Sequence, residues 1–152
     1  MDVIDQKILY ELQLNARLSM KELAKKVYLS SPSTTERVRK LEEQGIIKGY
    51  KTVVDVEKLE KNITAFVLFQ TTKCKELSKF CEEHQDVMEC YRVTGQISYI
   101  AKVCTASVHT LEDFIDEAMK FGTPSTNIVL SSNDTMDTKL FQQEFSSPIL
   151  KE

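Results

Sequence analysis

Three short helical patterns follow one another within the first 45 residues, and this succession constrains the fold more than any other feature of the sequence. In each pattern, apolar side chains recur at the spacing of one helix face. The three faces comprise Ile4, Ile8, Leu9 and Leu12, then Met20, Leu23, Ala24 and Val27, and finally Thr34, Val38 and Leu41. Only the segment from Tyr28 to Ser31 separates the second pattern from the third. Short helices joined by such a turn predict a helix-turn-helix.

Residues suited to helix ends mark the boundaries of these patterns. Asp2 is a suitable N-cap for the first helix, and Ser19 with Glu22 forms a capping box for the second. Gly45 predicts a left-handed residue at the end of the third helix. The residues that follow it, Ile46 to Tyr50, have the pattern of a short strand that enters a wing.

The third helix has two candidate starts. Ser31 can serve as an N-cap, with Pro32 in the first turn. Alternatively, Ser33 and Glu36 form a second capping-box pattern. We favour Ser31, because proline lacks the N–H group for which the first turn of a helix has no partner.

The exposed side of the third helix has the chemistry of a recognition helix. Such a helix contacts base edges mainly through its N-terminal residues. Small hydroxyl side chains let the helix enter the groove, and Arg37 or Arg39 could form the bidentate contact with guanine. Taken alone, this pattern is equally typical of a surface helix with solvated charges. The two helices that precede it favour DNA binding. We therefore predict that double-stranded DNA is contacted by Ser31, Ser33, Thr34, Thr35, Arg37, Arg39 and Lys40.

Charge is divided unevenly along the chain. Residues 1–52 hold ten Lys/Arg and seven Asp/Glu, whereas residues 53–152 hold ten Lys/Arg and sixteen Asp/Glu. The two parts therefore carry +3 and −6, which together give the net charge of −3. A basic N-terminal module suits contact with phosphates, and the acidic module suits another role.

From residue 63 onward, strand patterns and helix patterns alternate. The run at 63–72 is rich in β-branched and aromatic residues, as in a central strand, and Gly95-Gln96 predicts a two-residue hairpin turn. The predicted elements are a strand at 63–72, a helix through Leu77 and His84, strands at 87–93 and 97–103, a helix from Ser107 to Gly122 and a strand from Thr126 to Leu130. This βαββαβ order predicts a ferredoxin-like domain.

A sheet covered by two helices leaves its second face open. Pairing of that face with a second copy would bury it, so we expect a homodimer. The segment 132–152 is polar but contains Leu140, Phe141, Phe145, Ile149 and Leu150, and we expect it to pack on the body or on a partner.

Metal and catalytic chemistry are poorly supported. The cysteines Cys74, Cys81, Cys90 and Cys104 form no close pair, so we expect buried thiols and no structural zinc. Cys81 and His84 would supply only two metal ligands, and neither His84 nor His109 belongs to a nucleophile–base set. We expect neither an enzyme nor a cofactor.

The chain also lacks the marks of a membrane or exported protein. Its longest apolar run is far shorter than the ~20 residues that cross a bilayer. Its N-terminus carries Asp2 and Asp5, where a signal peptide has basic residues. We therefore expect a cytoplasmic protein that makes no membrane contact.

Residues 5–50 carry a specific combination of motifs. These are an Asp-x-x-Ile-Leu opening at Asp5, the run Asn-Ala-Arg-Leu-Ser from Asn15, the pattern Leu-Ser-(x)6-Arg-Val-x-x-Leu-Glu from Leu29, and Gly-Ile-Ile at Gly45. With the run Cys90 to Gly95 in the C-terminal half, the chain resembles the Lrp/AsnC (feast/famine) transcriptional regulators over essentially its whole length.

This resemblance implies that the ferredoxin-like part is the family's RAM domain, which pairs into dimers and often gathers them into octamers. In relatives, an amino acid binds near the second hairpin, at a loop that usually reads Gly-Asp-Tyr-Asp-Tyr. The corresponding candidate effector residues here are Gly95, Gln96, Ile97, Ser98 and Tyr99. Both acids are replaced, by Gln96 and Ser98, which removes a charge-assisted hydrogen bond to an ammonium group worth ~1.5–3 kcal/mol. The effector is therefore expected to be different, weak or absent.

The combined prediction is an α+β protein with three parts. Residues 1–52 form a winged helix-turn-helix, 53–61 a linker strand, and 62–152 a RAM-type oligomerisation and effector domain. We expect a sequence-specific DNA-binding regulator, whose dimer places two recognition helices ~34–36 Å apart. The alternatives are an architectural DNA-binding protein without an effector and a protein whose helix-turn-helix contacts another protein.

Overall fold

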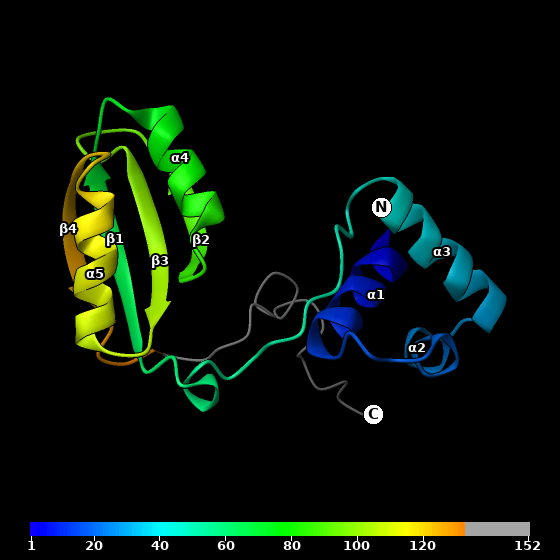
Figure 1. Ribbon diagram of the computed structural model, residues 1–152. Helices are drawn as coiled ribbons and strands as arrows, with labels where there is room; N and C mark the ends of the chain where they lie inside the picture. The colour runs from blue at the N-terminus through cyan, green and yellow to red at the C-terminus, as the bar shows by residue number, and fades with distance from the viewer. Residues whose placement is uncertain (133–152) are drawn as a thin grey trace, which may run out of the picture. The chain divides into compact units, whose positions relative to one another are not determined.

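The computed structural model describes residues 1–132, which form two compact units, Met1–Val53 and Val54–Ser132 (Figure 1). Each unit has its own apolar core. No helix in the described part of the chain is long and apolar enough to cross a membrane. The predicted packing of the C-terminal segment lies outside the described residues, apart from Ser132.

The first unit contains three helices, α1 (Val3–Leu14), α2 (Met20–Val27) and α3 (Ser31–Glu43). All three predicted apolar faces turn inward, which confirms the helix-turn-helix. The buried core consists of Ile8, Leu12, Leu23, Val27, Val38 and Leu41, with Ile4, Leu9, Leu18, Met20, Leu29 and Ile47 packed around it.

The starts of α1 and α2 are confirmed. Asp2 and Asp5 form a capping box on α1, in which each carboxylate accepts the other residue's backbone N–H at 2.9 Å. Ser19 and Glu22 form the predicted capping box on α2. These side chains satisfy N–H groups that the first helical turn leaves without partners.

The predicted start of α3 is wrong by one residue. The N-cap is Ser30, whose hydroxyl accepts the Ser33 N–H at 3.3 Å, so neither Ser31 nor the Ser33–Glu36 pair caps the helix. With Ser30 as the cap, Pro32 still lies in the first turn, and Ser33 supplies the N–H that the cap requires.

The prediction for Gly45 is confirmed, because it has φ +69° and directly follows Gln44, the C-cap of α3. The Ile46 N–H then bonds the Leu41 carbonyl at 2.9 Å. The predicted strand at 46–50 is wrong: these residues pair with no strand in the described chain. Tyr50 instead donates its hydroxyl to Glu42 at 2.9 Å, which ties the segment to the end of α3.

The predicted linker strand at 53–61 is also wrong. This segment contains a single turn of 3-10 helix, η1 (Glu57–Leu59), and joins no described sheet. Glu60 follows with φ +61°, and its N–H bonds the Glu57 carbonyl. A strand requires a neighbour to satisfy its backbone, and no described segment provides one here.

The second unit has the predicted βαββαβ order. Its elements are β1 (Ile63–Gln70), α4 (Cys74–Glu83), β2 (Val87–Arg92), β3 (Tyr99–Thr105), α5 (Val108–Ala118) and β4 (Thr123–Ile128). The strands form an antiparallel sheet of order β2-β3-β1-β4, which confirms the ferredoxin-like arrangement and the central place of β1.

Alternate residues of β1 face opposite sides of the sheet. Ala65, Val67 and Phe69 are fully buried beneath α4 and α5, which cover one face (Figure 1). Phe66 and Leu68 point to the other face, where Phe66 is 40% exposed. The open face predicted from the sequence is therefore present in this unit.

The predicted two-residue turn between β2 and β3 is wrong. Residues 93–98 form a longer loop, closed by a 2.9 Å hydrogen bond from the Val93 N–H to the Ser98 carbonyl. Gly95 has φ +112° within this loop, and Ile97 lies outside the strand predicted for it.

The predicted role of Gly122 as the end of α5 is wrong as well. The helix begins after Ser107, as predicted, but it stops at Ala118. A Cβ at Gly122 would lie 2.7 Å from the Gln70 carbonyl oxygen, so this glycine permits close contact with β1 instead. The last strand starts at Thr123, earlier than predicted, and Leu130 lies beyond it, 96% exposed.

Candidate DNA-binding surface and effector cavity

The recognition-helix candidate α3 presents most of its predicted contact residues to solvent. Ser33, Thr35, Arg39 and Lys40 are exposed and Ser31 is half-buried. The Thr35 hydroxyl donates to the Ser31 carbonyl at 2.9 Å, which leaves its oxygen lone pairs free to accept. The N-terminal half of α3 is therefore a surface of small hydroxyl side chains.

Thr34 does not belong to this surface. Its side chain is fully buried, and its hydroxyl donates to the Ser30 carbonyl at 3.0 Å. Thr34 packs in the core of the unit, as its place in the apolar stripe predicts, so its predicted DNA contact is ruled out by burial.

Arg37 is turned toward α1 and away from the exposed side of its own helix. Its guanidinium lies 2.7 Å from Asp5 and 2.8 Å from Asp2, at the N-terminus of α1. These hydrogen bonds raise the pKa of Arg37 above its ordinary value. The pKa of Asp2 is lowered, first by the Asp5 backbone N–H and then by Arg37. Arg37 therefore joins α3 to α1.

Arg39 is more than half exposed and lies between two acidic residues of α3. Its guanidinium bonds Glu36 at 2.7 Å and also bonds Glu43. The hydrogen bond from Arg39 lowers the pKa of Glu36, and Lys40 lies 3.7 Å from the same carboxylate. Exposed ion pairs of this kind contribute only ~0–1 kcal/mol to folding stability. Arg39 and Lys40 can therefore give up these pairs and contact DNA at little cost in stability.

Five further cations of this unit are exposed, form no ion pair with a described residue and were not predicted as contacts. They are Arg17, Lys21, Lys25, Lys48 and Lys51. Lys21 and Lys25 lie four residues apart on α2, opposite its buried face. Helical spacing alone would have identified this pair, because residues at i and i+4 share one face.

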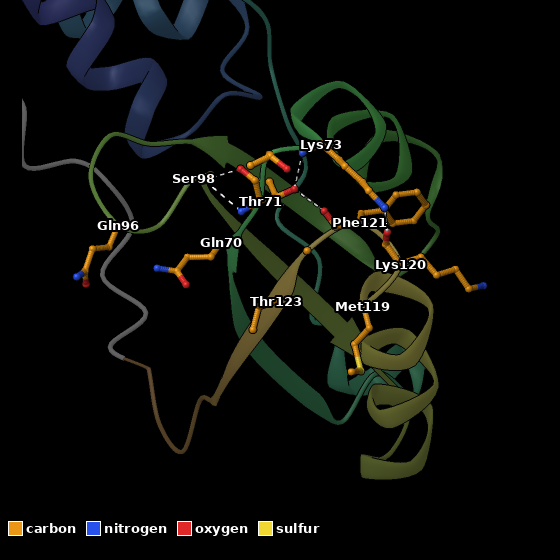
Figure 2. Close-up of a pocket in the computed structure, with 11 residues that line it drawn as sticks. Gln70, Thr71, Lys73, Gln96, Ser98, Met119, Lys120, Phe121 and Thr123 are labelled. Carbon is orange, nitrogen blue, oxygen red and sulfur yellow. Dashed lines mark hydrogen bonds between the residues drawn. The ribbon is translucent and has the colours of Figure 1, made fainter.

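The second unit contains a cavity of about 540 Å³ at one end of its sheet (Figure 2). It is lined by residues 70–73 at and beyond the end of β1, by Gln96 and Ser98 of the β2–β3 loop, and by residues 119–123, which run from the end of α5 to the start of β4. Two of the five predicted effector residues, Gln96 and Ser98, therefore line the cavity. Sequence reasoning missed the other two segments, because only the sheet brings them to this loop.

Hydroxyl groups hold the three segments of the cavity together. Ser98 donates its hydroxyl to the Thr71 carbonyl at 3.2 Å and accepts the Thr71 N–H at 3.4 Å. The Thr71 hydroxyl in turn donates to the Phe121 carbonyl and accepts the Lys73 N–H (Figure 2). These bonds connect the β2–β3 loop, β1 and the segment that follows α5.

Three of the predicted effector residues do not line the cavity: Gly95, Ile97 and Tyr99. Tyr99 is 6% exposed, and its hydroxyl donates to the Cys74 carbonyl at 3.1 Å. Tyr99 is therefore a core residue on the helix side of the sheet, and this packing role accounts for a tyrosine here without any contact to a ligand.

The charge of the cavity lining is one-sided. Among the described residues that line it, Lys73 and Lys120 are the ionisable ones, and none is Asp or Glu. The Lys73 ammonium donates to the Lys120 carbonyl at 2.9 Å. The positions where the resemblance leads one to expect carboxylates hold Gln96, which lines the cavity, and Ser98, whose hydroxyl is bonded to Thr71.

The residues weighed for metal chemistry are arranged as structural groups. Burial raises the pKa of the Cys81 thiol to about 12, so it is not a ready thiolate. The neighbouring His84 accepts the Asp86 N–H at its Nδ1 and packs edge-on against Phe114. The described residues contain no cluster of three or more potential metal ligands.

Comparison with known proteins covers both units. Residues 1–48 match the family described as winged helix-turn-helix DNA-binding, and residues 64–136 match the Lrp/AsnC ligand binding domain. The uncharacterized HTH-type transcriptional regulator YezC of Bacillus subtilis is 54% identical over 133 residues, which are 88% of this chain and 96% of that protein.

Solved structures agree with this match. The structure of LrpC from Bacillus subtilis, 36% identical, has a TM-score of 0.85 over 89% of this chain and 98% of its own. The feast or famine regulatory protein of Mycobacterium tuberculosis, solved in complex with L-methionine, is 28% identical, with a TM-score of 0.81 over 88% of this chain and 96% of its own.

Proposed function

The chain belongs to the Lrp/AsnC family of DNA-binding transcriptional regulators, and from this premise we propose that α3 is its recognition helix. The proposed contact residues are Ser31, Ser33, Thr35, Arg39 and Lys40. The observation that carries this assignment is the exposure of hydroxyl and cationic side chains along one side of α3, while its opposite side fills the core.

Within this surface, Arg39 is the proposed reader of guanine. Arginine bonds the O6 and N7 atoms of guanine with two donors, and Arg39 is the exposed arginine of α3. Lys21, Lys25 and Lys48 are proposed to contact phosphates, because they are exposed and without an ion pair to a described residue. Phosphate contacts set affinity and salt dependence, whereas base contacts set specificity.

A homodimer formed through the open face of the sheet is the proposed working unit. Phe66, Leu68 and Ile100 share this face, and Tyr91 lies opposite Ile100 in the register, 54% exposed. A second copy would remove these apolar groups from water, which is favourable in proportion to their area. Assembly of dimers into octamers is proposed from the family alone.

A small-molecule effector is proposed to bind in the cavity at the end of the sheet. Support comes from its lining by Gln96 and Ser98 and from the relative solved with L-methionine. Regulation of transcription, not catalysis, is the proposed activity, and the cytoplasm is its proposed location because chromosomal DNA lies there.

Fluorescence anisotropy with the DNA upstream of the protein's own gene tests this function, with random-sequence DNA as control and salt varied from about 50 to about 200 mM. Tight, salt-dependent and selective binding that Arg39→Ala weakens would support it. Equal affinity for both DNAs would favour an architectural role. Arg37→Ala is unsuitable as the diagnostic variant, since Arg37 joins two helices.

A further inference from the structure

We propose that the cavity binds a small carboxylate without an ammonium group, of the 2-oxo acid class, in preference to the amino acid with the same side chain. This inference rests on the proposed effector function of the cavity and specifies the chemistry of its ligand. Its basis is the one-sided charge of the lining and the hydrogen-bond state of the groups that a ligand would meet.

Electrostatics separate the two ligand classes. The described lining includes two lysines, Lys73 and Lys120, and no carboxylate. A ligand carboxylate therefore meets positive charge, whereas a ligand ammonium would lose water without gaining an ion pair and would face like charge. A 2-oxo acid carries only the favourable charge, and an amino acid carries both.

The donors available to a ligand are few and identifiable. Lys73 uses one of its three ammonium protons on the Lys120 carbonyl, which leaves two. The side-chain amides of Gln70 and Gln96 make no hydrogen bond with a described residue (Figure 2). An amide N–H donates equally well to a carboxylate or to a ketone oxygen, so these two residues suit both polar ends of a 2-oxo acid.

Two hydroxyl groups of the lining, those of Ser98 and Thr71, already have partners. The hydroxyls of Ser98 and Thr71 hold the loop to β1 and to Phe121, so they shape the cavity and have little left to offer a ligand. Apolar surface is supplied by Met119, which is 60% exposed, and by Phe121. These two residues lie where the hydrocarbon part of a ligand would make contact.

Matched ligand pairs provide the test, because each pair differs only in the oxo or amino group. Isothermal titration calorimetry of the full chain would compare pyruvate with L-alanine, 4-methyl-2-oxopentanoate with L-leucine, and phenylpyruvate with L-phenylalanine. At least one oxo acid should bind about tenfold or more tightly than its partner, which is the usual effect of one charge-assisted contact.

Gln96→Asp is the decisive variant. It places a carboxylate in the lining, so it should strengthen amino-acid binding and weaken oxo-acid binding, each by about tenfold. Gln85→Asp makes the same chemical change at an exposed position outside the cavity and should leave both affinities unchanged. Lys73→Met should weaken the oxo acid more than the amino acid, because the lysine also repels the ammonium group of the latter.

The possible outcomes separate this inference from the proposed function. Equal or tighter binding of the amino acids, or no binding of any oxo acid at millimolar concentration, overturns the ligand class. Selective DNA binding by the same preparation would then still support the regulator. Conversely, oxo-acid binding without selective DNA binding would sustain the ligand class and contradict the proposed recognition helix.

Discussion

The Arg37 guanidinium on α3 lies 2.7 Å from the Asp5 carboxylate at the start of α1. Asp5 also caps its own helix, since its carboxylate accepts the Asp2 N–H. One acidic residue therefore completes a helix cap and binds the neighbouring helix. This relationship transfers Arg37 from the proposed DNA contacts to the framework that positions α3.

Arg37→Ala is expected to lower the free energy of unfolding by about 1 kcal/mol, since the two ion pairs are only partly shielded from water. Urea unfolding followed by circular dichroism would measure the change. Arg39→Ala serves as the control, because its partners lie on its own exposed helix face. A larger loss for Arg39→Ala than for Arg37→Ala would contradict the assignment.

Arg39→Ala is expected to reduce affinity for the specific DNA site by about 1–3 kcal/mol and to reduce affinity for random DNA much less. Anisotropy titrations of both DNAs at one salt concentration would measure this. An equal loss on both DNAs would mean that Arg39 contacts phosphate and does not read bases.

Lys21→Gln and Lys25→Gln are expected to weaken binding to all DNA sequences alike. Each removed phosphate contact should reduce the slope of log K against log salt by about one. The same titration over a salt series would show this. Lys79→Gln, an exposed change in the second unit, should leave the slope unaltered.

Acid is expected to weaken the helix caps of the first unit. The pKa of Glu22 lies below its ordinary 4.5, first because of the hydrogen bond from the Ser19 hydroxyl, and the pKa of Asp2 lies below 3.8. A lowered folded-state pKa means stability that is complete well above these ordinary values and is lost as pH falls through the folded pKa.

Thermal unfolding between about pH 7 and about pH 3 should therefore show a Tm that falls with pH. The fall should be less steep in Glu22→Gln than in the unsubstituted protein, because glutamine can still cap the helix but cannot titrate. Identical pH profiles for the two proteins would refute a contribution of this cap.

Gly122→Ala is expected to destabilise the second unit by about 1–3 kcal/mol, a usual cost of overpacking. The new Cβ would meet the Gln70 carbonyl oxygen at 2.7 Å and the Thr71 Cβ at 2.9 Å, so β1 or the segment after α5 must move. Urea unfolding would measure the loss. The same variant should weaken ligand binding, because both segments line the cavity.

Phe66→Glu is expected to give a folded monomer. The glutamate would lie beside Lys102, its neighbour in the β1–β3 register, so the single chain tolerates it, whereas a buried interface does not. Size-exclusion chromatography with light scattering would measure the mass. Val108→Glu changes an apolar residue that is 60% exposed at the start of α5 and should leave the assembly intact. An unchanged mass for Phe66→Glu would exclude this face as the interface.

Local patterns predicted the elements of both units well. The spacing of apolar residues, such as Ile8 and Leu12 on α1, gives a helix one apolar face. Any stable fold must remove that face from water, so the pattern predicts which side is buried. The run of β1 and the caps at Asp2, Ser19 and Ser107 are likewise set by neighbouring residues. The errors lie at turns, as at Ser30 and in residues 93–98, and in the strands predicted at 46–50 and 53–61, because cap position, loop length and strand pairing depend on what the flanking elements contact.

The three N-terminal helices, the βαββαβ order of the second unit, the buried face of each element and the family could all be read from the sequence, since they follow from periodicity and from motifs contiguous in the chain. Which polar side chains face solvent depends instead on how the helices pack. Arg37 and Arg39 are both arginines of α3, yet the position of α1 turns one into a tie between helices and leaves the other exposed. The cavity likewise exists only because antiparallel pairing brings Gln70, Gln96 and Thr123 to one end of the sheet. Hydrogen bonds between distant segments produce that proximity, and no local spacing encodes it.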